Sequence, residues 1–208
     1  MTQYIHLLLL LFLTINCTDL FSTREDKVEK PTGTGVGTFE EATSPENVLI
    51  NYRRALENMN TEYYLDIFSN PDEFPSRPYN FYGDANFSAQ LPDPPWDYRE
   101  EKIFATNLLT DNTIFSITFN YVDSLPDVRY VSTGNDSLEI AETEFFNYEI
   151  IIKNKDSAKE KVYQGQSSVK FFRSAVGSEL WYVTEWLDKS IDTVATLSIL
   201  KLERYQGQ

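Results

Sequence analysis

The chain of 208 residues contains one histidine, His6, and one cysteine, Cys17. Both lie in or beside an apolar N-terminal segment, so a domain that begins after this segment has no histidine. This excludes from the domain Ser-His-Asp triads, Cys–His nucleophile pairs and zinc sites built on histidine or several cysteines. Acid–base chemistry would have to come from carboxylates, tyrosine, lysine or arginine, and we predict no metal and no cofactor.

Asp188 is the carboxylate that we single out as a candidate general base. It ends the segment ELWYVTEWLD, which we expect to form a strand. A carboxyl group that is removed from water at such a place has a raised pKa and can accept a proton. The same residue could instead cap or anchor the turn that follows the strand, and we favour this second interpretation.

Two acidic pairs, Glu40–Glu41 and Glu100–Glu101, are further candidates for carboxylate chemistry. Adjacent residues on a helix do not face each other, so neither pair can hold one reacting group between its two carboxylates. The spacing of an EF-hand calcium loop does not occur around them. We therefore interpret both pairs as solvated faces.

The formal net charge is −14, from 18 Lys and Arg against 32 Asp and Glu. An acidic chain repels phosphate backbones, so we predict no nucleic-acid partner. It also gains nothing from anionic lipid head groups, so any attachment to a membrane needs another cause. With 41% hydrophobic residues, the chain has enough apolar side chains for a folded core.

An apolar run from Ile5 to Ile15 precedes Cys17. It is shorter than the roughly 20 residues of a membrane-spanning helix and fits the hydrophobic region of a signal peptide. Cys17 could be a lipid attachment site, an incidental cysteine after a secretory signal, or a buried structural residue. The motif LTINC resembles a bacterial lipobox, although Thr14 and Asn16 replace its usual Leu and small residue.

We favour the lipoprotein interpretation. Residues 1–16 then form the signal peptide, and Cys17 carries the lipid that anchors the protein in the bacterial cell envelope. Residues 17–43 are charged and then rich in Thr and Gly, without a sustained apolar period. This composition predicts a flexible tether between the anchor and a domain that spans residues 44–208.

The domain begins with helical patterns. Ser44 is a natural N-cap and Pro45 fits the first helical position. Apolar residues then recur at helical spacing: Val48, Leu49, Tyr52, Leu56 and Met59. We expect a shorter helix after Asn60 or Thr61 and a third helix after Asp97.

Near residue 114 the apolar period falls to two, which is typical of strands. In TIFSITFNYV the residues expected to face the core are Phe115, Ile117, Phe119 and Tyr121. Four further strands are expected in the segments DVRYVS, FFNYEIIIKN, VYQGQSSVKFFRSA and ELWYVTEWLD. Helices followed by strands predict an α+β fold, with N-terminal helices packed on an antiparallel sheet.

The two ends of this domain resemble a known family. SPENVLINYRRALENMNTEYYLDIFS resembles the opening of bacterial nuclear transport factor 2-like, or SnoaL-like, domains, which have a cystatin-like fold. Near the C-terminus, a Trp-x-(Ile/Val)-x-x-Trp-x-Asp strand of that group is matched by Trp181, Val183, Trp186 and Asp188. Ser198, Leu200 and Lys201 correspond to parts of the tail that follows this strand.

The resemblance implies a cone, in which a curved sheet wraps over helices and its mouth forms a pocket. Ketosteroid isomerases and SnoaL-type cyclases use Asp there, often with His or Tyr. Tyr52, Phe119 and Tyr121 could line such a mouth, although we favour core packing for them. Trp181 and Trp186 could stack on a ligand, but a spacing of five on a strand puts them on opposite faces.

Our leading functional hypothesis is an envelope lipoprotein that acts as a non-catalytic binding or interaction module. Its partner would be a small hydrophobic ligand or a protein. The alternative is a small-molecule isomerase or dehydratase of the SnoaL type that uses Asp188 and a tyrosine. A homodimer through the exposed face of the sheet is a third expectation.

Overall fold

The computed structural model describes residues 38–83, 85–90, 96–131, 139–157, 159–173, 179–191 and 194–206. The predicted signal peptide, Cys17 and the tether as far as residue 37 lie outside these residues. None of the helices in the described ranges is long and apolar enough to cross a membrane.

The described strands form one eight-stranded sheet. Most of them follow the order β2-β1-β8-β7-β5-β4. The two remaining strands complete the sheet, because β6 also pairs with β7, and β3 pairs with β6. The strands are β1 (Asn80–Tyr82), β2 (Trp96–Asp97), β3 (Ile114–Tyr121), β4 (Val128–Val131), β5 (Glu139–Thr143), β6 (Phe146–Asn154), β7 (Glu160–Arg173) and β8 (Trp181–Lys189).

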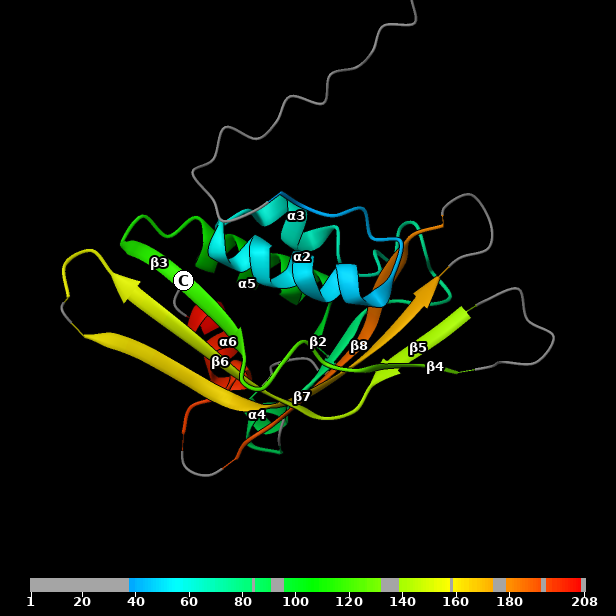
Figure 1. Cartoon of the computed structure of the whole chain (residues 1–208). Helices are drawn as coiled ribbons and strands as arrows, with labels where there is room; N and C mark the ends of the chain where they lie inside the picture. Colours follow the sequence, from blue (N-terminus) through cyan, green and yellow to red (C-terminus); the bar gives the residue numbers. More distant parts are fainter. Residues whose placement is uncertain are drawn as a thin grey trace, which may run out of the picture. The chain divides into compact units, whose positions relative to one another are not determined.

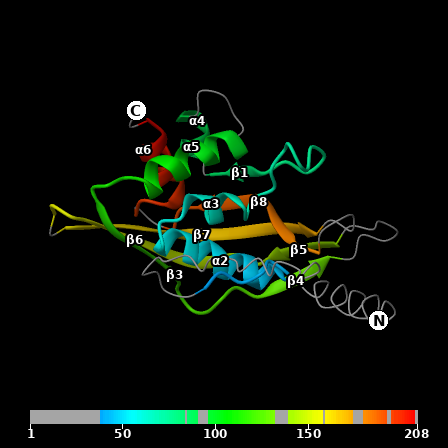
Figure 2. The same ribbon diagram turned by 90° about the horizontal axis from the view of Figure 1, so that it is seen from above.

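The helices are α2 (Pro45–Glu57), α3 (Thr61–Leu65), α4 (Ala85–Gln90), α5 (Tyr98–Leu109) and α6 (Leu197–Gln206). Helices α2, α3 and α5 lie over one face of the sheet (Figure 1). Seen from above, α2 lies toward β3, whereas α5 and α6 lie toward β8 and β1 (Figure 2). The predicted α+β fold, with helices packed on a curved sheet, is confirmed.

The curvature of the sheet follows from the length of β7, whose two halves pair with different strands. Its first half pairs with β6 and its second half with β5. Where the partner changes, the Val169 N–H donates to the Thr143 hydroxyl at 2.9 Å instead of to a backbone carbonyl. The sheet can therefore bend at this point without leaving a buried backbone donor unpaired.

The predicted helix starts are confirmed by their caps. The Ser44 hydroxyl accepts from the Asn47 N–H at 3.2 Å, and the Asn60 side chain accepts from the Tyr63 N–H at 3.0 Å. Asp97 forms a capping box with Glu100 at the start of α5. Each cap satisfies backbone donors that a helix leaves free at its N-terminus.

Two details of the strands differ from the sequence-based expectation. A register shift between Ile114 and Ser116 inverts the alternation at the start of β3, so Phe115 is 69% exposed and Ile114 is buried. The sheet is also not wholly antiparallel, because β1 runs parallel to β8. Strands β1 and β2 have only three and two residues, too few to show a period in the sequence.

Residues 39–42 contact the domain, although they belong to the segment predicted to be a tether. The ring of Phe39 stacks on Tyr63 with a centroid distance of 3.7 Å. The Asn51 side chain binds both backbone groups of Glu40, and the Trp181 N–H donates to the Ala42 carbonyl at 2.8 Å.

Candidate functional site

The residues singled out from the sequence lie almost entirely inside the domain. Five of them are at most 2% exposed: Tyr52, Phe119, Trp181, Trp186 and Asp188. The sixth, Tyr121, is partly buried, and its hydroxyl donates to the Leu49 carbonyl on α2 at 2.9 Å.

Trp181 and Trp186 face the same side of β8, so the prediction of opposite faces is wrong. Opposite β8, the register shifts between Lys170 and Phe171, so Thr184 has no partner across the ladder. Such a bulge adds one residue and inverts the alternation beyond it. Both indole rings therefore point toward the helices.

Aromatic side chains fill the space between α2 and the sheet. The Tyr52 ring lies 4.6 Å from Trp186 and 5.2 Å from Phe119, measured between centroids. Tyr64 and Phe68 extend this packing at 5.5 Å and 6.4 Å from Tyr52. These rings pack against one another between α2 and the sheet, where the family resemblance implies a pocket.

Asp188 connects the end of β8 to the start of α6. Its carboxylate accepts from the Ser198 N–H at 2.8 Å and from the Ser198 hydroxyl at 2.5 Å. It also accepts from the Tyr148 hydroxyl at 2.7 Å, and the same hydroxyl accepts from the Leu197 N–H at 2.7 Å. Asp188 and Tyr148 together satisfy two of the free backbone donors at the N-terminus of α6, those of Leu197 and Ser198.

Two glycines leave the space that this arrangement needs. A Cβ atom on Gly165 would lie 2.5 Å from the Tyr148 hydroxyl oxygen and 2.9 Å from the Lys189 carbonyl oxygen. A Cβ atom on Gly83 would lie 2.7 Å from the Ser198 hydroxyl oxygen. At Gly83 the added atom would also lie 2.5 Å from the ring of Phe87, so neither position admits a larger side chain unless its neighbours move.

The stability of the protein is expected to depend on the titration of Asp188. Burial raises the pKa of Asp188, whereas hydrogen bonds from Ser198 and Tyr148 lower it, and the net direction is upward. An acid with a raised pKa binds more protons in the folded state than in the unfolded state. The contribution of Asp188 to the free energy of unfolding therefore decreases as the pH rises above 3.8, the ordinary pKa of an aspartate.

The free energy of unfolding of the wild type minus that of Asp188→Asn should therefore decrease as the pH rises. The difference is measured by urea unfolding from about pH 4 to neutrality. Groups that do not interact with residue 188 titrate alike in both proteins, so their contributions cancel. A difference that increases with pH over this range would contradict the assignment.

A second buried carboxylate, Glu101, forms an ion pair with Lys201. Their side chains are 0% and 1% exposed, and the Lys201 Nζ lies 2.5 Å from a Glu101 oxygen. Glu101 also accepts from the Tyr64 hydroxyl at 2.6 Å and from the Trp96 Nε1–H at 2.7 Å. The pair joins α5 to α6 across 100 positions of the sequence.

Aromatic rings surround the ammonium group of Lys201. Its Nζ lies 4.3 Å from the ring centroid of Phe104, 4.6 Å from that of Phe81 and 5.3 Å from that of Trp96. Burial lowers the pKa of Lys201, and the charge of Glu101 opposes this effect. The rings and the carboxylate replace the water that the ammonium group loses on folding.

The sequence-based interpretation of the pair Glu100–Glu101 as a solvated face is wrong for Glu101. Glu101 lies three, four and seven residues before Phe104, Ala105 and Leu108, which are all buried on the same face of α5. This spacing was the available signal, because it places the carboxylate on the apolar face. Glu100, in contrast, completes the capping box.

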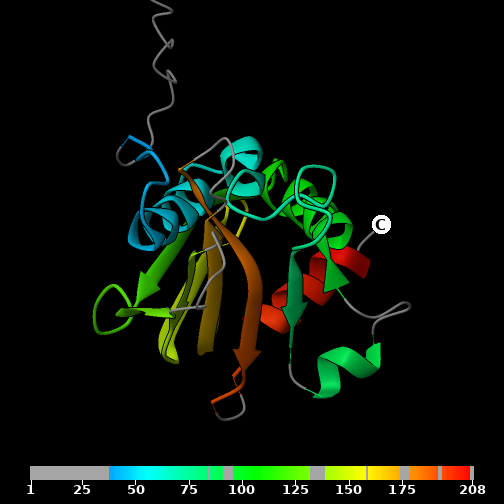
Figure 3. The same ribbon diagram turned by 90° about the vertical axis from the view of Figure 1, so that its right-hand side faces the viewer.

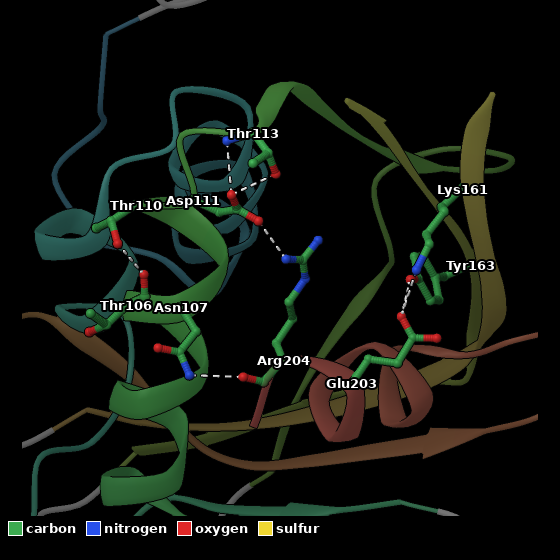
Figure 4. A network of polar contacts seen from close by, with 9 residues as sticks. All are labelled: Thr106, Asn107, Thr110, Asp111, Thr113, Lys161, Tyr163, Glu203 and Arg204. Atoms are coloured by element: carbon green, nitrogen blue, oxygen red, sulfur yellow. Dashed lines mark hydrogen bonds and ion pairs between the residues drawn. The ribbon is translucent and has the colours of Figure 1, made fainter. Parts of the chain in front are cut away.

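Helix α6 is also fixed along its outer side (Figure 4). The Arg204 guanidinium pairs with Asp111 at 2.7 Å, and the Asn107 side chain donates to the Arg204 carbonyl at 2.8 Å. On the other side, Glu203 accepts from Tyr163 and Lys161 of β7. Figure 3 shows α6 beside α5 at the edge of the helical layer.

The chemistry available to these groups is limited by access. Asp188 with Tyr148 is a carboxylate–tyrosine pair of the kind that the alternative function requires, and Tyr148 was not identified from the sequence. Both side chains are at most 2% exposed, and their polar atoms are engaged with α6. Among the described residues, no group of three or more His, Cys, Asp or Glu side chains is placed to hold a metal ion.

An open groove lies outside this interior, at the surface beside α3. We call it the acidic groove. Its volume is about 380 Å³. It is lined by Glu40, Glu41, Ala42, Asn51, Tyr63, Leu65, Asp66, Ile67, Phe68, Asn70, Glu73, Phe74, Tyr98, Leu180 and Tyr182.

Comparison with solved structures gives the following likenesses. A nuclear transport factor 2-like superfamily protein from Salmonella enterica is 14% identical, with a TM-score of 0.46 over 71% of this chain and 89% of that one. A putative scytalone dehydratase from Novosphingobium aromaticivorans is 8% identical, with a TM-score of 0.49 over 73% of this chain and 89% of that one.

A protein of unknown function with a cystatin-like fold from Nostoc punctiforme is 10% identical, with a TM-score of 0.39 over 71% of this chain and 88% of that one. The structural neighbours are nuclear transport factor 2-like and cystatin-like proteins. This is the resemblance predicted from the sequence, and it is a likeness of fold. No protein-family model matches the chain, and a search of curated proteins gives no match.

Proposed function

We propose that this protein is a non-catalytic binding or interaction module that a lipid on Cys17 holds at the bacterial cell envelope. One observation carries the non-catalytic part. The buried carboxylates Glu101 and Asp188 are at most 2% exposed, and each is paired with groups that hold α5 and α6 in place. In this arrangement neither carboxylate is exposed to a substrate.

The alternative, an isomerase or dehydratase, is favoured by one specific observation, the hydrogen bond between Tyr148 and Asp188. One structural neighbour is called a putative scytalone dehydratase, but its identity of 8% bears on the fold alone. Catalysis by this pair would require a substrate to displace Ser198 from Asp188. The surface groove offers a ligand an accessible site without such a rearrangement.

The anchor is tested by metabolic labelling with an alkyne analogue of palmitate. We expect the wild type to incorporate the label and to sediment with membranes, because the thiol of Cys17 carries the lipid. Cys17→Ala should lose both the label and the sedimentation, whereas Thr18→Ala should keep both. Label that is retained after Cys17→Ala would rule out this anchor.

A homodimer through the sheet and the lack of a nucleic-acid partner stay predictions. The outward face of the sheet carries charged pairs that run across strands, such as Lys170–Glu185 between β7 and β8 at 2.6 Å. A dimer through this face would have to accommodate these charges.

A further inference from the structure

The acidic groove gathers carboxylates from separate parts of the chain. Glu40 and Glu41 precede α2, Asp66 follows α3, and Glu73 belongs to the segment that leads to β1. None of the described residues that line the groove is Lys or Arg. Arg54 on α2 pairs with Glu40 at 2.9 Å. The other three carboxylates form no ion pair with a described residue.

The walls of the groove are aromatic. Tyr63 is held by its stack on Phe39, and Phe74 packs against Tyr182 with a centroid distance of 4.7 Å. Tyr98, at the start of α5, lines the groove as well. Faces of aromatic rings attract cations, and fixed rings do so with little loss of side-chain entropy on binding.

The carboxylates act on a common region. Burial and the charges of Glu62 and Glu73 raise the pKa of Asp66. Burial and the charges of Asp66, Glu73 and Asp72 raise the pKa of Tyr98. Negative potential therefore converges beside a tyrosine ring inside a concave site, which is the environment that a desolvated cation requires.

Hydrogen bonds to β8 hold the backbone of the groove. The segment after α3 pairs with β8, since the Val183 N–H donates to the Ile67 carbonyl and the Ser69 N–H donates to the Val183 carbonyl, both at 2.9 Å. Across the groove, Trp181 binds the Ala42 carbonyl at 2.8 Å. The site is thus present before any ligand binds, which lowers the entropic cost of binding.

We propose that the acidic groove docks a cationic peptide segment of a protein partner, with lysine or arginine side chains between the carboxylates and the aromatic walls. This inference rests on the proposed binding function and gives it a partner of stated chemistry. A neutral apolar ligand fits less well, because it would remove carboxylates from water without compensation.

The test measures binding of fluorescein-labelled hexalysine to the detergent-solubilised full-length protein by fluorescence anisotropy at low salt. We expect saturable binding that weakens about tenfold or more in Asp66→Asn/Glu73→Gln, because two charge contacts are lost. The matched control Asp123→Asn/Glu144→Gln removes the same charge from exposed positions that do not line the groove. It should stay within about twofold of the wild type.

Three results would overturn the proposal. They are no binding of hexalysine to the wild type, equal weakening in both double variants, and binding of free spermine without binding of hexalysine. Urea unfolding of each variant shows that it is folded. If hexalysine fails to bind while Cys17 still takes up the lipid label, the groove assignment fails and the anchor stands.

Discussion

Lys201→Met is expected to lower the free energy of unfolding by about 3–5 kcal/mol. The substitution leaves the carboxylate of Glu101 buried without a cation, held among the described residues only by hydrogen bonds to neutral groups such as Tyr64 and Trp96. Methionine fills the space among the three aromatic rings, so the loss reports the missing charge rather than a cavity. Urea unfolding monitored by tryptophan fluorescence measures it.

Two comparisons make this result specific. Lys153→Met breaks an ion pair whose side chains are 47% and 44% exposed, and it should cost at most about 1 kcal/mol. In Glu101→Gln/Lys201→Met neither charge of the pair remains, and the amide can still bond to Tyr64 and Trp96, so most of the stability should return. A loss for Lys201→Met as small as that for Lys153→Met would refute the structural role of the pair.

Asp188→Ala is expected to release α6 and to lower the free energy of unfolding by about 3 kcal/mol or more. The substitution leaves the Ser198 N–H, the Ser198 hydroxyl and the Tyr148 hydroxyl without their common acceptor in a buried site. Hydrogen exchange should report faster opening of the amides of α6 than of β7. Urea unfolding gives the total loss.

Glu185→Ala is the matched control for this prediction. Glu185 lies on the same strand, faces outward and pairs with Lys170 at a half-exposed position. Its loss should cost at most about 1 kcal/mol and should leave exchange in α6 unchanged. Unchanged exchange in α6 of the Asp188→Ala variant would show that Asp188 does not anchor the helix.

Much of the fold could be predicted because local signals agree with it. Caps at Ser44, Asn60 and Asp97 marked helix starts, and alternation marked the long strands. The bulges could not be predicted. An extra residue such as Phe115 or Thr184 is extra only relative to the neighbouring strand, and the pairing with that strand is not visible in the local sequence. One such bulge turned Trp186 to the same face as Trp181.

The interior polar groups show the same limit. Asp188 was identified, and its role as an anchor was the favoured interpretation, yet its partner Tyr148 lies 40 positions away. Glu101 and Lys201 are 100 positions apart, so no local pattern joins them. Glu101 lies on the apolar face of α5 and Lys201 on that of α6, but only the packed structure brings the two charges together.

The central claim of this account is that ligands bind at the acidic groove while the interior charges maintain the fold. The most direct measurement compares hexalysine anisotropy for the interior variant Glu101→Gln/Lys201→Met and the groove variant Asp66→Asn/Glu73→Gln. We expect the interior variant, once shown to be folded, to bind within about twofold of the wild type, and the groove variant to bind about tenfold more weakly. Normal binding by the groove variant together with lost binding by the folded interior variant would contradict the account.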